Sequence, residues 1–520
     1  MAPHGPIVEA SDGALEGLQE AALHVFRGIP YAEPPERWKP PQPVSRWSGV
    51  RRATAFGPAA VQPPSPAGSI YEISADHPQP MSEDCLTLNI WAPAGVSAAP
   101  VLIWIHGGSL VIGSSREGFY DGAKLASRGI VVVTINYRLG VFGWLAHPGL
   151  SAESPLGISG NYGLLDQIEA LRWIRRNIAA FGGDPNNVTI TGESAGALSV
   201  MYLMASPLAR GLFAKAIAQS AYMITTPMLK ERRYGLPCAE EAGAKLARAL
   251  GTNDIAVLRA VPPGDLALRA SAAGFAPFGA VDGHVLPDQL VDVFDRGEQA
   301  PVPLLAGFNS GEIRSLRFLV PPPPDTATEY EAVIRDRYGD LAGEYLRLYP
   351  ATDVRESLYA GTRDALYGWT AERLVRKQAS SGQPSYLYFW DHGYPAADST
   401  GRRAFHGSEI PYAFGTADRS TSRWPKVPST PQELKLSEVM VGYWSSFARS
   451  GRPQAANAPE WPAFGTSGHA LVIDEDLHAT CDLMPGMFAL HEEVVRRRRA
   501  HDIAWNWNVG LWSPKNPVTT

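Results

Sequence analysis

Ser194 is the serine of a G-x-S-x-G motif, GESAG, formed by residues 192–196. A short apolar run, residues 188–190, precedes the motif, and an apolar stretch, residues 197–204, follows it. Glycines permit a sharp strand-to-helix turn that raises the serine oxygen out of a sheet, and the start of the helix stabilises nearby negative charge. The pattern predicts a nucleophilic serine. The plainer interpretation is that two glycines only end a strand and cap a helix.

A second glycine motif, HGGS at residues 106–109, directly follows the apolar run at residues 101–105. It is similar to the HGGG type of motif, whose glycines let backbone N–H groups point at an oxyanion. A strand followed by a glycine loop is the context that this chemistry needs. Together the two motifs predict acyl transfer, in which a hydroxyl attacks a carbonyl carbon and amides stabilise the charged oxygen.

The elements that must position these motifs are visible as short apolar runs, at residues 101–105, 130–135, 188–191 and 214–220. Continuous apolar runs are typical of strands that are buried on both faces. Residues 164–178 repeat apolar side chains at helical spacing, and Gly182 and Gly183 follow where a helix should end. This βαβ order predicts an α/β fold with a parallel sheet covered by helices.

Further strands are expected at residues 302–307 and 386–390, and residues 326–380 have a mostly helical pattern. No repeat with a period of about 20–50 residues occurs, and no linker is long enough to separate two cores. We therefore expect one domain over residues 1–520, with a largely helical insertion at about residues 315–380.

Composition excludes several classes of protein. Hydrophobic residues make up 45% and charged residues 19%, which is a globular balance. The net charge of −6 provides no positive field for nucleic acid or an anionic membrane, so we expect neither partner. The three cysteines form no C-x-x-C pair and are too few for a disulfide framework. Since no signal peptide and no long apolar run occur, a cytoplasmic location is expected.

Many ordered motifs resemble those of the type-B carboxylesterases, the cholinesterase-like family of the α/β-hydrolase fold, in particular bacterial para-nitrobenzyl esterase-like enzymes. They include FRGIPYAEPP (26–35), SEDCLTLNIW (82–91), NYRLGVFG (136–143), GNYGLLDQIEALRWIRRNIAAFGGDP (160–185), GFNSGE (307–312), FHGSEIPYAFG (405–415) and YWSSFARSGRP (443–453). The resemblance implies a large, mostly parallel central sheet with helices on both faces and helical insertions around an active-site gorge. It also implies a serine carboxylesterase that works through an acyl-enzyme intermediate.

By the same resemblance, the catalytic triad consists of Ser194, Glu312 and His406. Glu312 matches the acid of a G-x-N-x-D-E-G pattern, although Gly311 and Ile313 replace the residues expected on either side of it. His406 matches the family's base. The alternatives are a solvated carboxylate at a helix start for Glu312 and a core histidine for His406.

The resemblance assigns the oxyanion hole to the backbone N–H groups of Gly108, Ser109 and Ala195, with Gly107 as possible support. Ser109 stands where glycine or alanine is usual. Its amide can serve only if its backbone conformation suits a residue with a Cβ atom.

Several charged residues have supporting roles by resemblance. Arg138 and Asp166 would form a buried structural ion pair, and Glu83 would also be structural. Glu409 follows His406 by three positions and is a possible support of the site. Glu193 is either a buried carboxylate that adjusts the field of the site or a hydrogen-bonded structural group.

The expected substrates are neutral, apolar, small to medium esters, and no metal or cofactor is expected. Ala75 stands where cholinesterases carry an indole that holds a quaternary ammonium, so choline esters are disfavoured. Cys85 lacks the upstream cysteine of secreted members, which favours a cytoplasmic, bacterial-type enzyme. The alternatives are an amidase or carbamate hydrolase with the same triad and a non-catalytic adhesion or binding protein. The oligomeric state stays open.

Two features near the C-terminus have simpler interpretations. Glu492 and Glu493 precede the arginine run 496–499 at the spacing of helical ion pairs, which predicts a solvated helix face. Trp505, Trp507 and Trp512 lie in a polar tail that either packs on the body of the protein or forms a subunit contact.

Overall fold

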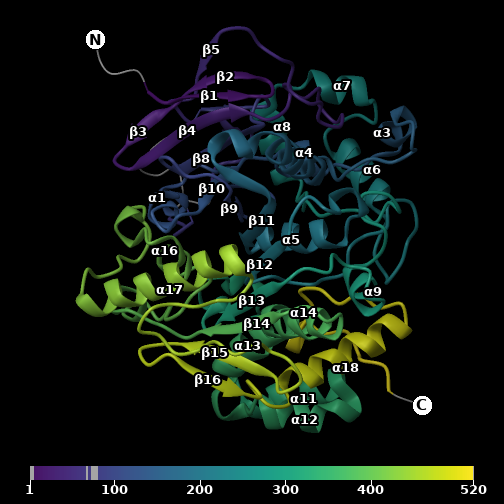
Figure 1. Ribbon diagram of the computed structural model, residues 1–520. Helices are drawn as coiled ribbons and strands as arrows, with labels where there is room; N and C mark the ends of the chain where they lie inside the picture. The colour runs from purple at the N-terminus through teal and green to yellow at the C-terminus, as the bar shows by residue number, and fades with distance from the viewer. Residues whose placement is uncertain (1–4, 66–67, 72–79, 519–520) are drawn as a thin grey trace.

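The structure is a computed structural model that describes residues 5–65, 68–71 and 80–518. Its centre is a large mixed sheet (Figure 1). In chain order, its strands are β3 (Leu18–Glu20), β4 (Leu23–Pro30), β8 (Thr87–Pro93), β9 (Ala99–Ile105), β10 (Val131–Ile135), β11 (Gly183–Glu193), β12 (Lys215–Gln219), β13 (Leu304–Asn309), β14 (Ser385–Trp390), β15 (His469–Ile473) and β16 (His478–Cys481).

The strands lie in the order β16-β15-β14-β13-β12-β11-β9-β10-β8-β4-β3. Every pair from β15 to β10 is parallel, whereas the pairs at both ends of the sheet are antiparallel. The parallel part contains all the strands expected from the apolar runs. This is the mostly parallel α/β architecture that the sequence predicts.

Helices cover both faces of the sheet because consecutive residues of a strand point to opposite faces. In β9, Ile103 packs in a core with α4 (Tyr162–Asn177), α5 (Ala195–Ala205) and α14 (Trp369–Ser380). Its neighbour Trp104 packs in a second core with α1 (Ala123–Ala126), α16 (Ile410–Phe414) and α17 (Pro431–Ser450). Two buried faces explain why the strands have continuous apolar sequences.

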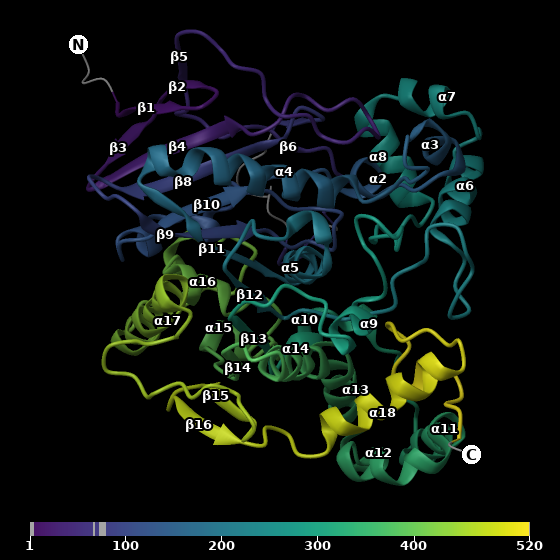
Figure 2. The same cartoon turned by 45° about the vertical axis from the view of Figure 1, so that its right-hand side comes forward.

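Smaller units surround the sheet. Strands β1 (Ile7–Ala10), β2 (Gly13–Glu16) and β5 (Val50–Arg52) form a separate sheet, and β6 (Ala59–Ala60) pairs with β7 (Met81–Ser82). The remaining α-helices are α2 (Gly140–Trp144), α3 (Pro148–Glu153), α6 (Ala239–Ala249), α7 (Ile255–Ala260), α8 (Pro263–Ala272), α9 (Leu290–Asp295), α10 (Glu312–Ser315), α11 (Ala327–Tyr338), α12 (Ala342–Leu348), α13 (Val354–Arg363), α15 (Pro395–Asp398) and α18 (Met487–Ala500). Figure 2 shows α11, α12 and α18 side by side, where they share a tyrosine-rich core.

The ion pair of Arg138 and Asp166 is confirmed. The Asp166 carboxylate accepts hydrogen bonds from the guanidinium at 2.8 and 2.7 Å and from the Arg138 amide at 3.0 Å. Both side chains are buried. The pair fastens the segment after β10 to helix α4, which is a structural role. Glu83 likewise pairs with Arg37, whose guanidinium also donates to carbonyls at the end of α7.

The prediction of a solvated arginine face on α18 is wrong for Arg497 and Arg498, which are buried. Arg496 is exposed and pairs with Glu493. In contrast, Arg497 is buried against Asp340, and Arg498 is buried against Ser513 and two asparagines of the C-terminal tail. Arg499 pairs with two aspartates of α9. Arg497 keeps the predicted i,i+4 pair with Glu493 at 2.7 Å, and partners from distant segments are added to it.

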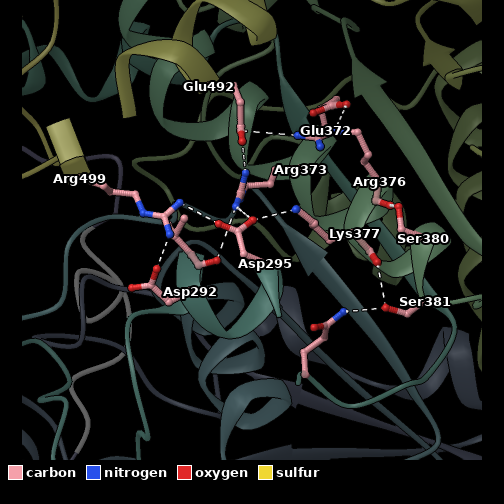
Figure 3. A network of polar contacts seen from close by, with 12 residues as sticks. Asp292, Asp295, Glu372, Arg373, Arg376, Lys377, Ser380, Ser381, Glu492 and Arg499 are labelled. Carbon is pink, nitrogen blue, oxygen red and sulfur yellow. Dashed lines mark hydrogen bonds and ion pairs between the residues drawn. The ribbon is translucent and has the colours of Figure 1, made fainter. Parts of the chain in front are cut away.

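Figure 3 shows the polar network between α9, α14 and α18. Asp295 accepts from Arg373, Lys377 and Arg499, and these cations lower its pKa to about 2 although burial raises it. Glu492 pairs with Arg373 instead of the arginine run. The network anchors the C-terminal helix to the body.

The C-terminal tail packs on the body. Trp505 is buried, and its backbone carbonyl accepts a hydrogen bond from the Thr225 amide at 2.8 Å. Across the described ranges, the helices are all too short or too polar to cross a lipid bilayer.

Candidate active site

Ser194 lies at the turn between β11 and α5. Its φ of 56° and ψ of −121° are strained for a residue with a side chain. The turn is held by a 2.9 Å hydrogen bond from its amide to the Gln219 carbonyl at the end of β12. A Cβ atom on Gly196 would lie 2.0 Å from the Ile105 carbonyl oxygen, so only glycine permits this close approach to β9. The motif forms the predicted strand-to-helix turn.

The glycine loop after β9 touches this turn. A Cβ atom on Gly107 would lie 2.8 Å from the Glu193 carbonyl oxygen and 3.3 Å from the Cβ atom of Ser194. Gly108 has a φ of 100°, and Ser109 and Leu110 have φ values of 57° and 60°. Ser109 therefore adopts the left-handed conformation despite its Cβ atom.

Three backbone N–H groups at this junction have no hydrogen-bond acceptor among the described residues. The backbone N–H groups of Gly108, Ser109 and Ala195 donate no hydrogen bond to any residue within the described part of the chain. The helix start explains the Ala195 amide, because the first N–H groups of a helix have no intrahelical acceptor. Donors that the fold leaves unpaired beside Ser194 are suited to bind a developing oxyanion.

Glu312 and His406 are in direct contact through Oε2 and Nδ1. Glu312 begins α10 just after β13, is fully buried, and accepts a 2.8 Å hydrogen bond from the Asn309 amide on its other oxygen. The Gly311 amide donates to the Ala404 carbonyl at 2.9 Å, which joins the two loops. Glu312 is thus no solvated carboxylate, and His406 holds a buried carboxylate on its Nδ1 side.

The other ring nitrogen of His406 faces Glu193. Its Nε2 lies 3.1 Å from Oε1 of Glu193, the residue directly before Ser194. Burial lowers the pKa of His406, but the Glu193 and Glu312 carboxylates outweigh burial and raise it to about 9. Burial raises the pKa of Glu193 to about 8. Of its two interpretations, the geometry favours a carboxylate that acts on the field at the histidine.

The structure brings Glu312, His406 and Glu193 into contact, with Ser194 next in the chain. Among the described contacts, Ser194 Oγ makes no hydrogen bond to His406. Hydrogen bonds of this kind are often long without substrate and shorten in the reacting complex.

Glu409 supports the site from a fully buried position. Its two oxygens accept hydrogen bonds from Gln219 at 2.9 Å and from the Asn309 side chain at 2.6 Å. Because the backbone N–H of Asn309 also donates to Glu312, this asparagine connects the two carboxylates. The sequence does not single out Gln219 and Asn309. The signal that could indicate them is their position, since each ends a strand at the carboxyl edge of the sheet.

No metal centre accompanies this arrangement: the residues that the structure describes contain no group of three or more His, Cys, Asp or Glu side chains arranged to hold an ion. The buried nucleophile, histidine and carboxylates are suited to acyl transfer through a serine.

The model of the carboxylesterase family matches residues 4–485. The chain belongs to the carboxylesterase family. It is 37% identical to a fumonisin B1 esterase of Sphingopyxis macrogoltabida, over 89% of this chain and 85% of that protein. It is 34% identical to the para-nitrobenzyl esterase of Bacillus subtilis (strain 168), over 91% and 95%. A solved para-nitrobenzyl esterase structure superposes with a TM-score of 0.80 at 32% identity, covering 94% of this chain and 99% of that one.

These matches confirm the type-B carboxylesterase resemblance and the α/β-hydrolase fold. The same matches show that the protein is a carboxylic ester hydrolase whose substrate is a small-molecule ester.

Aromatic rings that the sequence did not single out surround His406 in this carboxylesterase. Tyr71 lies at a centroid distance of 6.4 Å from the imidazole, and its hydroxyl donates to the His406 carbonyl at 2.9 Å. The ring centroid of Tyr367 lies 5.4 Å from that of the imidazole, and this tyrosine belongs to a π-helical turn, Asp364–Gly368. Such turns are frequent at functional sites because the extra residue redirects a side chain.

The aromatic wall continues away from the histidine. Tyr222 contacts Tyr367 at 6.1 Å and Trp507 of the C-terminal tail at 5.1 Å. The tail therefore reaches the surroundings of the active site, which its composition alone does not indicate.

Proposed function

We propose that the enzyme hydrolyses carboxylic esters with Ser194 as nucleophile, His406 as general base and acid, and Glu312 as the group that orients the imidazole. The observation that carries this proposal is the placement of His406, with Nδ1 on the buried Glu312 carboxylate and Nε2 3.1 Å from Oε1 of Glu193, the residue directly before Ser194.

The proposed reaction has two steps. Ser194 Oγ attacks the ester carbonyl while His406 takes its proton, and the tetrahedral oxyanion accepts hydrogen bonds from the amides of Gly108, Ser109 and Ala195. The intermediate collapses, and His406 protonates the departing alcohol. Water then attacks the acyl-enzyme by the same sequence of proton transfers. Each oxyanion donor contributes about 3 kcal/mol to the lowering of the barrier.

The supporting residues act through these groups. Gly107 lets the glycine loop reach Ser194, and Glu193 keeps the pKa of His406 high. Glu409 holds Asn309, whose amide holds Glu312.

The proposed substrates are neutral, apolar, small to medium esters. The proposed reaction uses no metal or cofactor, and neither nucleic acid nor a membrane is a proposed partner. The aromatic rings of Tyr71, Tyr222 and Tyr367 support an apolar substrate site. The expectation against choline esters rests on Ala75, which lies outside the described residues.

The decisive test compares hydrolysis of para-nitrophenyl acetate and butyrate by the wild type and Ser194→Ala in the presence of EDTA. We expect kcat to fall by at least about a thousandfold in the folded variant, because the nucleophile is lost. Circular dichroism checks the fold.

Ser206→Ala is the matched control for this experiment. Ser206 ends the same helix, and its hydroxyl has no hydrogen-bond partner among the described residues, so its loss should leave kcat unchanged. Turnover that persists unchanged in Ser194→Ala would reject Ser194 as the nucleophile. No turnover by the wild type would favour the non-catalytic homologue.

A further inference from the structure

A pocket opens behind Tyr71, whose ring lies near His406. Its walls come from residues 68–71, from the segment 314–318 after Glu312, and from residues 400 and 402 before His406, and its volume is about 620 Å³. Three segments that are distant in sequence therefore converge on it, and two of them lie within a few residues of Glu312 and His406.

Tyr71 is the wall that this pocket shares with the active site. It lines the pocket, while its hydroxyl donates to the His406 carbonyl at 2.9 Å and lies 2.8 Å from Ser315 Oγ. A molecule in the pocket thus lies one side chain away from the catalytic imidazole.

The pocket is cationic. Arg314, Arg317 and Arg402 line it, and no carboxylate does so among the residues that the structure describes. Arg314 is paired with Glu356. Arg317 donates only to the Arg314 carbonyl at 3.1 Å, and Arg402 has no carboxylate partner in the described ranges. Two guanidinium groups are therefore available to an anion in a protein whose net charge is −6.

The rim adds apolar surface. Phe318, beside Arg317, is 72% exposed and also lines the pocket. An exposed large apolar side chain next to unpaired cations suits a ligand with a carboxylate on a hydrocarbon chain, because a guanidinium fork matches a carboxylate with two parallel hydrogen bonds.

We propose that this pocket binds a carboxylate carried by the alcohol part of the ester substrate. His406 must protonate the departing alcohol, so the alcohol part lies beside the imidazole. Tyr71, whose ring centroid lies 6.4 Å from the imidazole, also lines the pocket. This inference rests on the proposed function and extends its substrates from neutral esters to esters of hydroxy acids.

The test uses two substrates of equal shape, the butyrate esters of ω-hydroxyhexanoic acid and of ω-hydroxyhexanamide. They differ by a carboxylate against a neutral carboxamide, and hydrolysis is followed in a pH-stat. We expect the wild type to have the higher kcat/KM for the carboxylate ester, with a preference that falls as salt screens the arginines.

The variant is Arg317→Gln combined with Arg402→Gln, which keeps much of each side-chain stem. We expect the preference for the carboxylate ester to fall by at least about tenfold, the effect of losing charge-assisted hydrogen bonds. Arg172→Gln is the matched control: it removes an exposed cation of α4, a helix that contributes nothing to the pocket, and should leave the preference unchanged.

A preference that is absent in the wild type, or the same in the double variant, overturns the proposal. Binding separates this failure from failure of the serine mechanism. Calorimetry with Ser194→Ala should detect tighter binding of the carboxylate ester than of the carboxamide ester. This difference in binding should disappear when Ser194→Ala is combined with Arg317→Gln and Arg402→Gln. Equal binding of the two esters contradicts the pocket assignment whatever the turnover.

Discussion

At the scale of single residues, the position of His406 between two carboxylates controls when it can act as a base. Glu312 contacts Nδ1, and Glu193 lies 3.1 Å from Nε2. Since a general base must be neutral, and both carboxylates stabilise the protonated imidazole, activity requires a higher pH than an ordinary histidine would. A histidine without these neighbours would give a midpoint near its ordinary pKa of about 6.5.

We predict that kcat/KM for a neutral ester rises with pH with a midpoint above that value, in line with the raised pKa of about 9. Glu193→Gln keeps the shape of the side chain but removes its charge, so the midpoint should move to lower pH. The measurement is the pH profile of kcat/KM from pH-stat or para-nitrophenyl assays.

Glu331→Gln, on the exposed side of α11, serves as the control and should not move the midpoint. A profile that is the same in Glu193→Gln and the wild type would show that this carboxylate does not tune the histidine.

At the scale of elements, the turn between β11 and α5 depends on close packing against β9. A Cβ atom on Gly196 would meet the carbonyl oxygens of Ile105 and His106 at 2.0 and 3.0 Å. These are backbone atoms of a central strand, so they cannot move aside as a side-chain end can.

We therefore predict that Gly196→Ala lowers the free energy of unfolding by at least about 1–3 kcal/mol and reduces kcat strongly, because α5 and the Ser194 turn must shift. Thermal unfolding and steady-state kinetics measure the two effects.

Gly343→Ala in α12 is the matched substitution. Nothing lies within 4 Å of its added Cβ atom, so it should stabilise the helix by up to about 1 kcal/mol. A Gly196→Ala protein as stable and active as the wild type would contradict the packing argument.

Which elements could be predicted depends on how local their signals are. The strands β9 to β12 and helix α4 follow from apolar periodicity, which is a property of consecutive residues. The contacts of Tyr367, Trp507 and Gln219 join segments far apart in the chain, so no local pattern contains them. The arginines of α18 show the same limit, because helical spacing indicates partners within the helix but not the competing aspartates of α9.

The triad positions came from a different source. Glu312 and His406 were predicted by family resemblance, since their separation in sequence gives no geometric information. The cationic pocket was not predicted at all, because Arg317 and Arg402 converge only after folding.

At the scale of the whole molecule, we propose that residues 1–520 form one domain, with helices α11 to α14 as its insertion. One hydrophobic core contains residues as distant as Ala10 and Val509, and the central sheet extends from β3 to β16.

A core and a sheet that both extend over most of the chain predict one cooperative unfolding transition. Calorimetry and far-ultraviolet circular dichroism should give coincident midpoints, and tryptophan fluorescence should follow them. Two separated calorimetric transitions would instead indicate two folding units.

The distribution of the thiols has a practical consequence. Cys85 and Cys238 are buried, whereas Cys481 is exposed at the end of β16, the outer strand of the sheet. A maleimide reagent will therefore react with folded protein at one defined position. Every molecule immobilised through that bond will have the same orientation on its support, and its chemistry at the turn after β11 will remain unmodified.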